Sequence, residues 1–140
     1  MKKMLVTGGT VFVSKYIAEY FAKKDFEVFV LNRNTRPQPE NTRLIQADRN
    51  NIGSALKGHS FDIVIDTGYS EKDVKNLLDA FGSPELCGKE KYIFISSSAV
   101  YPETLPLPFK ESYKSGRNKI WGDYGTNKIH AEEYLLSQKN

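Results

Sequence analysis

Short apolar runs alternate along the chain with segments in which apolar residues recur every three or four positions. The short runs predict buried strands, and the recurring positions predict helices that pack on them. Alternating strands and helices are typical of a parallel sheet with crossover helices. The expected strands cover residues 4–7, 27–31, 43–46, 61–66 and 91–96.

Helical spacing predicts four helices. The first begins near Val13 and places Val13, Ile17, Tyr20 and Phe21 on one face; the others cover 50–57, 74–81 and about 124–137. Residues 102–122 are rich in proline at their start and predict a long loop, which in a compact domain is usually functional or mobile. The expected fold is an α/β, doubly wound parallel sheet of about five strands with flanking helices, the Rossmann fold, in one nucleotide-binding domain over residues 1–140.

A glycine-rich segment at residues 7–14, Thr-Gly-Gly-Thr-Val-Phe-Val-Ser, stands where the first strand passes into the first helix. Glycines allow a sharp bend close to a pyrophosphate, which the N–H groups and dipole of the helix start then bind. Phe12 is expected to anchor this turn in the core. The dinucleotide fingerprint asks for small residues at Gly8, Val11 and Ser14, and only the first is glycine, so a turn without ligand is the alternative. The expected cofactor-binding residues of the turn are Gly8, Gly9, Thr10, Val11, Phe12 and Val13.

The end of the second strand bears on the choice between NAD and NADP. NAD-binding domains carry an acidic residue there for the ribose 2′-hydroxyl, whereas this strand ends without a carboxylate and is followed by Arg33 and Arg36. Arg33 is placed to meet a 2′-phosphate or to stack on adenine, so NADP is slightly favoured. Asp48 is expected either to hydrogen-bond the adenine amino group or to cap the helix at 50–57.

Tyr124 and Lys128 lie four residues apart at the start of the last expected helix, and hence on one face. An ammonium beside a phenol favours the phenolate and makes the tyrosine a usable acid and base. Ser97 and Ser98 follow the fifth strand, at the sheet edge where such folds bind ligands, and a serine there can hold a substrate oxygen. Simple turn chemistry is the alternative for the serines, and a surface pair is the alternative for Tyr124 and Lys128.

Three motifs occur along the chain in the order Thr-Gly-Gly-Thr-x-Phe-Val, Ser-Ser-Ser-Ala-Val-Tyr and Tyr-x-x-x-Lys. Together they resemble the extended short-chain dehydrogenase/reductases, in particular the NAD-dependent epimerase/dehydratases of nucleotide sugars. The resemblance implies hydride transfer to or from nicotinamide, with Tyr124 as catalytic tyrosine, Lys128 also holding the nicotinamide ribose, and Ser97 as catalytic serine. It further implies a nucleotide-sugar-type substrate. The Gly-Gly-Thr-x-Phe turn is also similar to that of chloroplast stem-loop RNA-binding proteins.

Relatives in this family continue into a smaller C-terminal substrate domain, which is missing from the 140 residues. Three explanations for the missing domain are open: the chain is a fragment of a longer enzyme, a natural truncation, or a module completed by a partner. The fragment is favoured. The isolated chain is expected to bind NAD or NADP and to turn over poorly or not at all. The resemblance also implies a possible homodimer through the helices at 74–81 and 124–136. The alternative function is a non-catalytic dinucleotide-binding or RNA-binding module, with RNA possible but not favoured.

Composition changes this picture little. The net charge of +3, with scattered basic residues, is too small to argue for nucleic acid by itself. Cys87 is the single cysteine, so no intrachain disulfide is expected, and no apolar run is long enough for a membrane helix. His59 and His130 lack metal-ligand spacing, so no metal site is proposed, and the chain is expected to be cytoplasmic.

Overall fold

A computed structural model of the chain describes residues 1–138. The chain divides into two compact units: unit 1 is 1–68 with 75–95, and unit 2 is 69–74 with the chain from 96 onward. The expectation of one nucleotide-binding domain over 1–140 stays a prediction, and its last two residues lie outside the described part. None of the helices within residues 1–138 combines the length and the apolar character needed to span a bilayer.

Unit 1 is built on a five-stranded sheet in the order β3-β2-β1-β4-β5, and every neighbouring pair is parallel. This arrangement confirms the doubly wound sheet. The strand order reverses between β1 and β4, which is where such sheets bind ligands. The strands are β1 (Lys2–Thr7), β2 (Phe26–Asn32), β3 (Arg43–Gln46), β4 (Phe61–Asp66) and β5 (Cys87–Phe94).

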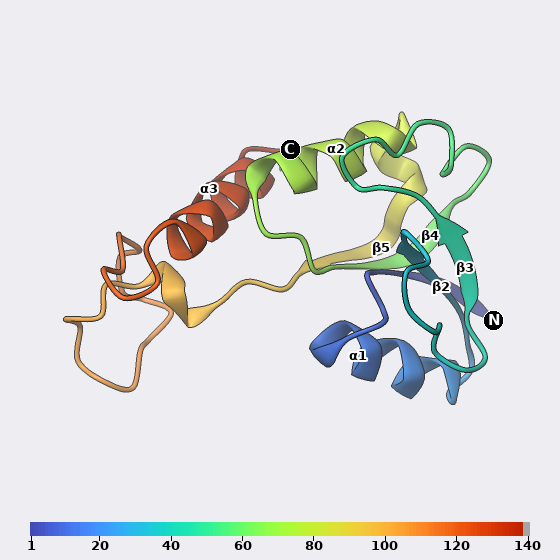
Figure 1. Ribbon diagram of the computed structural model, residues 1–140. Coiled ribbons are helices and arrows are strands. Elements are labelled where there is room, and N and C mark those ends of the chain that lie inside the picture. The colour runs from blue at the N-terminus through green and yellow to red at the C-terminus, as the bar shows by residue number, and fades with distance from the viewer. Residues whose placement is uncertain (139–140) are drawn as a thin grey trace. The chain divides into compact units, whose positions relative to one another are not determined.

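Alternate residues of the central strands feed two apolar clusters, as a sheet covered on both faces requires. Met4 and Val6 of β1 share one cluster with Ala18 of α1 (Phe12–Ala22). Leu5 lies in the other cluster with Leu77, from the part of α2 (Glu71–Phe81) that belongs to unit 1. Figure 1 shows α1 in blue beside the sheet.

The inward face of α1 differs from the expected one. Ser14 and Ala18 are buried, with Ile17 and Phe21 half-buried beside them, whereas Val13 and Tyr20 are exposed. The helix packs through positions i, i+3, i+4 and i+7 counted from Ser14, because the Ser14 side chain is part of the preceding turn. A pattern based on apolar residues does not count Ser14 as buried, so it predicted a different inward face.

The helix expected at residues 50–57 is absent. Separate turns occur there instead. In one the Ala55 N–H donates to the Ile52 carbonyl at 3.2 Å, and in the next the Lys57 N–H donates to the Ser54 carbonyl at 2.9 Å. Gly53 has φ +59, a left-handed conformation that interrupts a right-handed helix. Ile52 and Leu56 still reach the core, which accounts for the helix-like spacing of apolar residues.

Unit 2 contains the short 3-10 helix η2 (Ser98–Val100), a long connection and α3 (Asp123–Ser137). Residues 102–122 contain neither helix nor strand, as predicted. Buried Asn118 holds this connection, since its amide donates to the Tyr101 carbonyl at 3.0 Å and its oxygen accepts from the N–H groups of Ile120 and Trp121. A second 3-10 helix, η1 (Pro84–Leu86), belongs to unit 1.

Candidate functional site

The turn after β1 requires its two glycines. Gly8 and Gly9 have φ +83 and +90, and the Gly8 N–H donates to the Leu31 carbonyl at 2.8 Å. A β-carbon on Gly9 would lie 2.6 Å from Cγ1 of Val30, so any other residue would push the turn away from β2. The turn therefore follows a sharp path against β2 that only glycines allow.

Ser14 completes this turn from within α1. Its hydroxyl accepts the Gly9 N–H at 3.0 Å and donates to the Val11 carbonyl at 2.9 Å. A β-carbon on Gly8 would meet the Ser14 oxygen at 3.1 Å, so the serine fills the corner tightly. Ser14, which stands at the third position of the dinucleotide fingerprint in place of glycine, is therefore a structural part of the turn.

The N-terminus of α1 presents unsatisfied N–H groups. Val11 is the N-cap in an extended conformation, without a capping hydrogen bond from its side chain, and the first turn carries no acidic residue. The N–H groups at the start of a helix have no partner inside it and form an anion site with the helix dipole. The backbone of Thr10 to Val13 is therefore a candidate for binding a pyrophosphate, which stays a prediction.

Phe12 does not anchor the turn in the core, contrary to the expectation. It has φ +46 and its side chain is 91% exposed. Extended Val11 and left-handed Phe12 carry the chain around the corner, and Ser14 and Ala18 occupy the inward positions. The backbone of Phe12 remains a candidate for phosphate binding, whereas its ring is a surface group.

Asn32 at the end of β2 was missed by the sequence analysis. Its amide nitrogen donates to the Gly8 carbonyl at 2.7 Å and to Gln38 Oε1 at 2.8 Å, and its oxygen accepts from the Asn34 N–H at 2.8 Å and from Gln38 Nε2 at 3.1 Å. An amide has two donors and two acceptor sites, so this hydrogen-bonding capacity is filled. Arg33 and Arg36, in contrast, are exposed.

Asp48 is exposed, and its Oδ1 accepts the Asn50 N–H at 2.8 Å. The helix at 50–57 that Asp48 was expected to cap is absent, so the capping alternative is wrong and Asp48 stabilises a turn instead. The adenine contact expected of Asp48 stays a prediction.

Asp66 at the end of β4 is a second missed residue. It is fully buried, pairs with Arg49 at 2.7 Å, and accepts from the Gly68 N–H at 2.8 Å and from the Tyr92 hydroxyl. Burial, followed by the charge of Asp66, raises the pKa of Tyr92. This cluster fixes the start of the β4–α2 connection.

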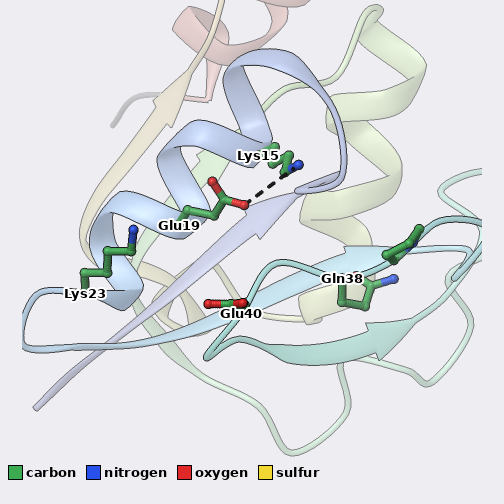
Figure 2. A pocket seen from close by; sticks show the side chains of 6 residues that line it. Lys15, Glu19, Lys23, Gln38 and Glu40 are labelled. Carbon is green, nitrogen blue, oxygen red and sulfur yellow. Dashed lines mark ion pairs between the residues drawn. The ribbon is translucent and has the colours of Figure 1, made fainter.

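A hollow of about 400 Å³ in unit 1 lies between α1 and the β2–β3 connection (Figure 2). Two lysines and two glutamates face it, and Lys15 pairs with Glu19 at 3.9 Å. The two positive and the two negative side chains of its lining balance in charge. Its lining residues are Lys15, Glu19, Lys23, Pro37, Gln38 and Glu40.

In unit 2, α3 carries Tyr124 and Lys128 one turn apart, as predicted. Lys128 is 3% exposed and its Nζ lies 5.9 Å from the Tyr124 ring centroid, while Tyr124 is 40% exposed. A buried ammonium near a partly exposed phenol is the arrangement that acid–base work by the tyrosine needs.

The three serines at the start of η2 have different environments. Ser97 is the N-cap of η2 and its oxygen accepts the Ala99 N–H at 3.1 Å, whereas Ser98 is exposed. The hydroxyl of Ser96 is buried without a hydrogen-bond partner among the described residues. Turn chemistry thus accounts for one acceptor site of Ser97 and leaves its donor available.

The remaining candidates for chemistry are possible metal ligands, the two histidines and the single cysteine. Within residues 1–138, no group of three or more His, Cys, Asp or Glu side chains could hold a metal ion. His59 stacks on Phe61 with centroids 5.9 Å apart, and His130 is exposed. Cys87 is a buried free thiol whose pKa is raised to about 12, first by burial and then by the charge of Asp66.

Comparisons with known proteins agree with this architecture. Residues 4–140 match the model of the NAD dependent epimerase/dehydratase family. The UDP-Glc/GlcNAc 4-epimerase from Campylobacter jejuni is 18% identical with a TM-score of 0.80, over 98% of this chain and 49% of that one. The UDP-glucose 4-epimerase from Bifidobacterium longum in complex with NAD+ and UDP is 20% identical with a TM-score of 0.78, over 96% of this chain and 48% of that one. At such identities the likeness establishes the fold.

A curated relative is the chloroplast stem-loop binding protein of 41 kDa b from Arabidopsis thaliana, 27% identical over 129 residues, which are 79% of this chain and 33% of that protein. The chain thus spans a third of this relative and about half of the solved structures above. The family match covers almost the whole chain. The chain belongs to the NAD-dependent epimerase/dehydratase family.

Proposed function

We propose that the chain is the cofactor-binding part of an NAD(P)-dependent epimerase, dehydratase or reductase that acts on a nucleotide-sugar-type substrate. The observation that carries the proposal is the turn at Gly8 to Ser14, whose N–H groups at the start of α1 fit a pyrophosphate. Family membership and the likeness to an epimerase in complex with NAD+ and UDP support it.

The residues of unit 2 supply the proton chemistry. Tyr124 gives a proton to, or takes it from, the substrate oxygen at the reacting carbon, and the Lys128 ammonium stabilises its phenolate and binds the nicotinamide ribose. Ser97 donates its hydroxyl hydrogen to the same substrate oxygen. When bound, the nicotinamide supplies the acceptor or donor of hydride.

NADP is proposed as the slightly favoured cofactor. The Asn32 amide is filled by hydrogen bonds to Gly8, Asn34 and Gln38, so it has no group left for ribose hydroxyls. Arg33 and Arg36 are exposed cations next to it, and guanidinium groups suit a 2′-phosphate.

Thermal-shift titration with NAD, NADH, NADP and NADPH tests the proposal. A ligand that binds the folded chain raises its melting temperature in a concentration-dependent way. We expect stabilisation by all four nucleotides, larger for the NADP pair, and little or no turnover of UDP-sugars by these 140 residues. Absence of stabilisation by any of them at millimolar concentration would refute cofactor binding.

RNA binding is the second candidate function, and α1 favours it. Phe12, Tyr16, Tyr20 and Lys24 follow one another at intervals of four, and the three rings are 91%, 69% and 45% exposed. Tyr16 and Tyr20 stack with centroids 6.1 Å apart, and the Lys24 ammonium lies 5.2 Å from the Tyr20 centroid. Exposed rings beside lysines are what single-stranded bases and phosphates bind.

Salt-dependent RNA affinity separates this candidate from the first. An RNA-binding module keeps its RNA affinity in Tyr124→Phe, loses it in Tyr16→Ala, and shows no stabilisation by dinucleotides. A cofactor module that binds no RNA is stabilised by dinucleotides and shows no RNA affinity.

A homodimer through residues 74–81 and 124–136 is a further proposal. Leu77 and Phe81 are core residues of unit 1, which leaves α2 little apolar surface for a second copy. Leu136 on α3 is 60% exposed. Light scattering measures the mass, and a Leu136→Lys variant is expected to shift any dimer toward monomer.

A further inference from the structure

Tyr69 lies beside the Tyr124–Lys128 pair in unit 2, and nothing so far gives it a role. Its ring centroid is 6.3 Å from that of Tyr124. The Lys128 Nζ lies 5.3 Å from the Tyr69 centroid, closer than the 5.9 Å to the Tyr124 centroid. Both distances are within the range of about 6 Å at which an ammonium is attracted to a ring face.

The backbone of Tyr69 is fixed although its ring is 64% exposed. Its N–H donates to Asp73 Oδ2 at 2.9 Å, and the Asp73 N–H donates in turn to the Ser70 hydroxyl at 3.2 Å. Ser70 directly precedes the first residue of α2, so these bonds form a cap at the helix start. Tyr69 is therefore presented by a capped helix terminus and not by a free loop.

Burial strengthens the attraction between the Tyr69 ring and the Lys128 ammonium. Lys128 is 3% exposed, and an ammonium removed from water gains more from a ring face than a solvated one does. Lys128 also has a long flexible stem, so contacts with ring faces restrict the position of its ammonium. Tyr69 is a ring available for this in addition to Tyr124 itself.

We infer that Tyr69 is a positioning residue whose ring face holds the Lys128 ammonium next to Tyr124 before any cofactor is bound. The inference rests on the proposed function in that it takes Tyr124 and Lys128 as the acid–base pair. The ring face does the holding and the Tyr69 hydroxyl is not needed. Phenylalanine at position 69 should therefore preserve the arrangement, and leucine should lose it.

The test uses proton–carbon NMR spectra of the full chain without cofactor. The ε-methylene signal of Lys128, assigned by its loss in Lys128→Arg, is expected to be displaced by ring currents by a few tenths of a ppm from those of the exposed lysines. Tyr69→Phe should keep this displacement, and Tyr69→Leu should lose about half of it or more. Tyr16→Leu is the matched control, because Tyr16 is 69% exposed and stacks on Tyr20.

Acetylation of lysines followed by mass spectrometry gives a second readout. Lys128 should be acetylated several-fold faster in Tyr69→Leu than in Tyr69→Phe, while Lys15 reacts equally in both. If thermal melting shows that Tyr69→Leu is not folded, Tyr69→Gln takes its place. Retention of the displacement in Tyr69→Leu, or its absence from the unsubstituted chain, overturns the inference.

The outcome is distinguishable from that of the proposed function. Dinucleotide stabilisation of the unsubstituted chain decides the proposed function without any change at Tyr69. Failure there with an intact Lys128 displacement removes the cofactor proposal and leaves Tyr69 as the residue that positions the lysine. The reverse result leaves cofactor binding and removes only the role of Tyr69.

Discussion

The carbonyl oxygen of Ala99 lies so close to the position of a β-carbon on Gly125 that the two atoms would overlap, so η2 and α3 approach each other as closely as only glycine allows. Gly125 directly follows Tyr124, and the Ala99 N–H donates to the hydroxyl oxygen of Ser97, the N-cap of η2. This single contact therefore sets the spacing of the two elements that carry the proposed catalytic tyrosine and serine.

Gly125→Ala is expected to lower the free energy of unfolding by about 1–3 kcal/mol, because the added methyl group overlaps backbone that cannot move aside cheaply. Urea unfolding measures the loss. Asn127→Ala is the matched control, since Asn127 is exposed on the same helix. Equal stability of the two variants would mean that η2 and α3 are not in this contact.

Ser14→Ala removes both hydrogen bonds by which the serine closes the phosphate turn. The Gly9 N–H loses its partner and the Val11 carbonyl keeps only the Lys15 N–H, so we expect a loss of about 1–2 kcal/mol in unfolding free energy and weaker stabilisation by dinucleotides. Urea unfolding and thermal-shift titration measure the two effects. Ser137→Ala, an exposed serine of α3, should change neither. Unchanged dinucleotide binding in Ser14→Ala would show that the turn holds its shape without the hydroxyl.

The sheet could be predicted from the sequence because it depends on runs of apolar residues, and strands β3 and β4 begin and end where the pattern placed them. The motif residues of unit 2 were found for a similar reason, since Tyr124 and Lys128 are brought together by one helix. Local spacing is sufficient in both cases.

The failures depend on information that spacing does not contain. Gly53 breaks a segment whose apolar positions suit a helix, and the positive φ of Phe12 turns a large apolar side chain to the solvent. The partnerships of Asn32 with Gln38 and of Asp66 with Arg49 depend on tertiary packing. Tyr69 meets Lys128 for the same reason, and no motif contains it.

Arg33→Glu is expected to reverse the cofactor preference. A carboxylate at the end of β2 repels a 2′-phosphate and can accept from a ribose 2′-hydroxyl, so NADPH affinity should fall on the order of tenfold, about 1.4 kcal/mol, while NADH affinity holds or rises. Thermal-shift titration with both nucleotides measures the ratio. Lys57→Glu, an exposed change of equal charge elsewhere in unit 1, should leave the ratio as it was. If Arg33→Glu lowers both affinities equally, Arg33 does not read the 2′ position.

The buried Cys87 thiol makes stability depend on alkaline pH. Its pKa is raised from 9.0 to about 12 in the folded chain, first by burial and then by Asp66. Between these values the unfolded state has lost the thiol proton and the folded state keeps it, so the free energy of unfolding falls as pH rises. The contribution is complete below about pH 9, and its slope is at most about 1.4 kcal/mol per pH unit.

Urea unfolding at several pH values from about 8 to about 10.5 measures this slope, and Cys87→Ala isolates it. The variant is less stable at every pH because of the cavity it leaves, but its decline above about pH 9 should be shallower. Tyr92, whose pKa burial and then Asp66 raise from its ordinary value of 10.0, adds a decline of the same sign at higher pH in both proteins. Parallel curves for the two proteins between about pH 9 and about pH 10 would contradict the prediction, since only the thiol distinguishes them in that interval.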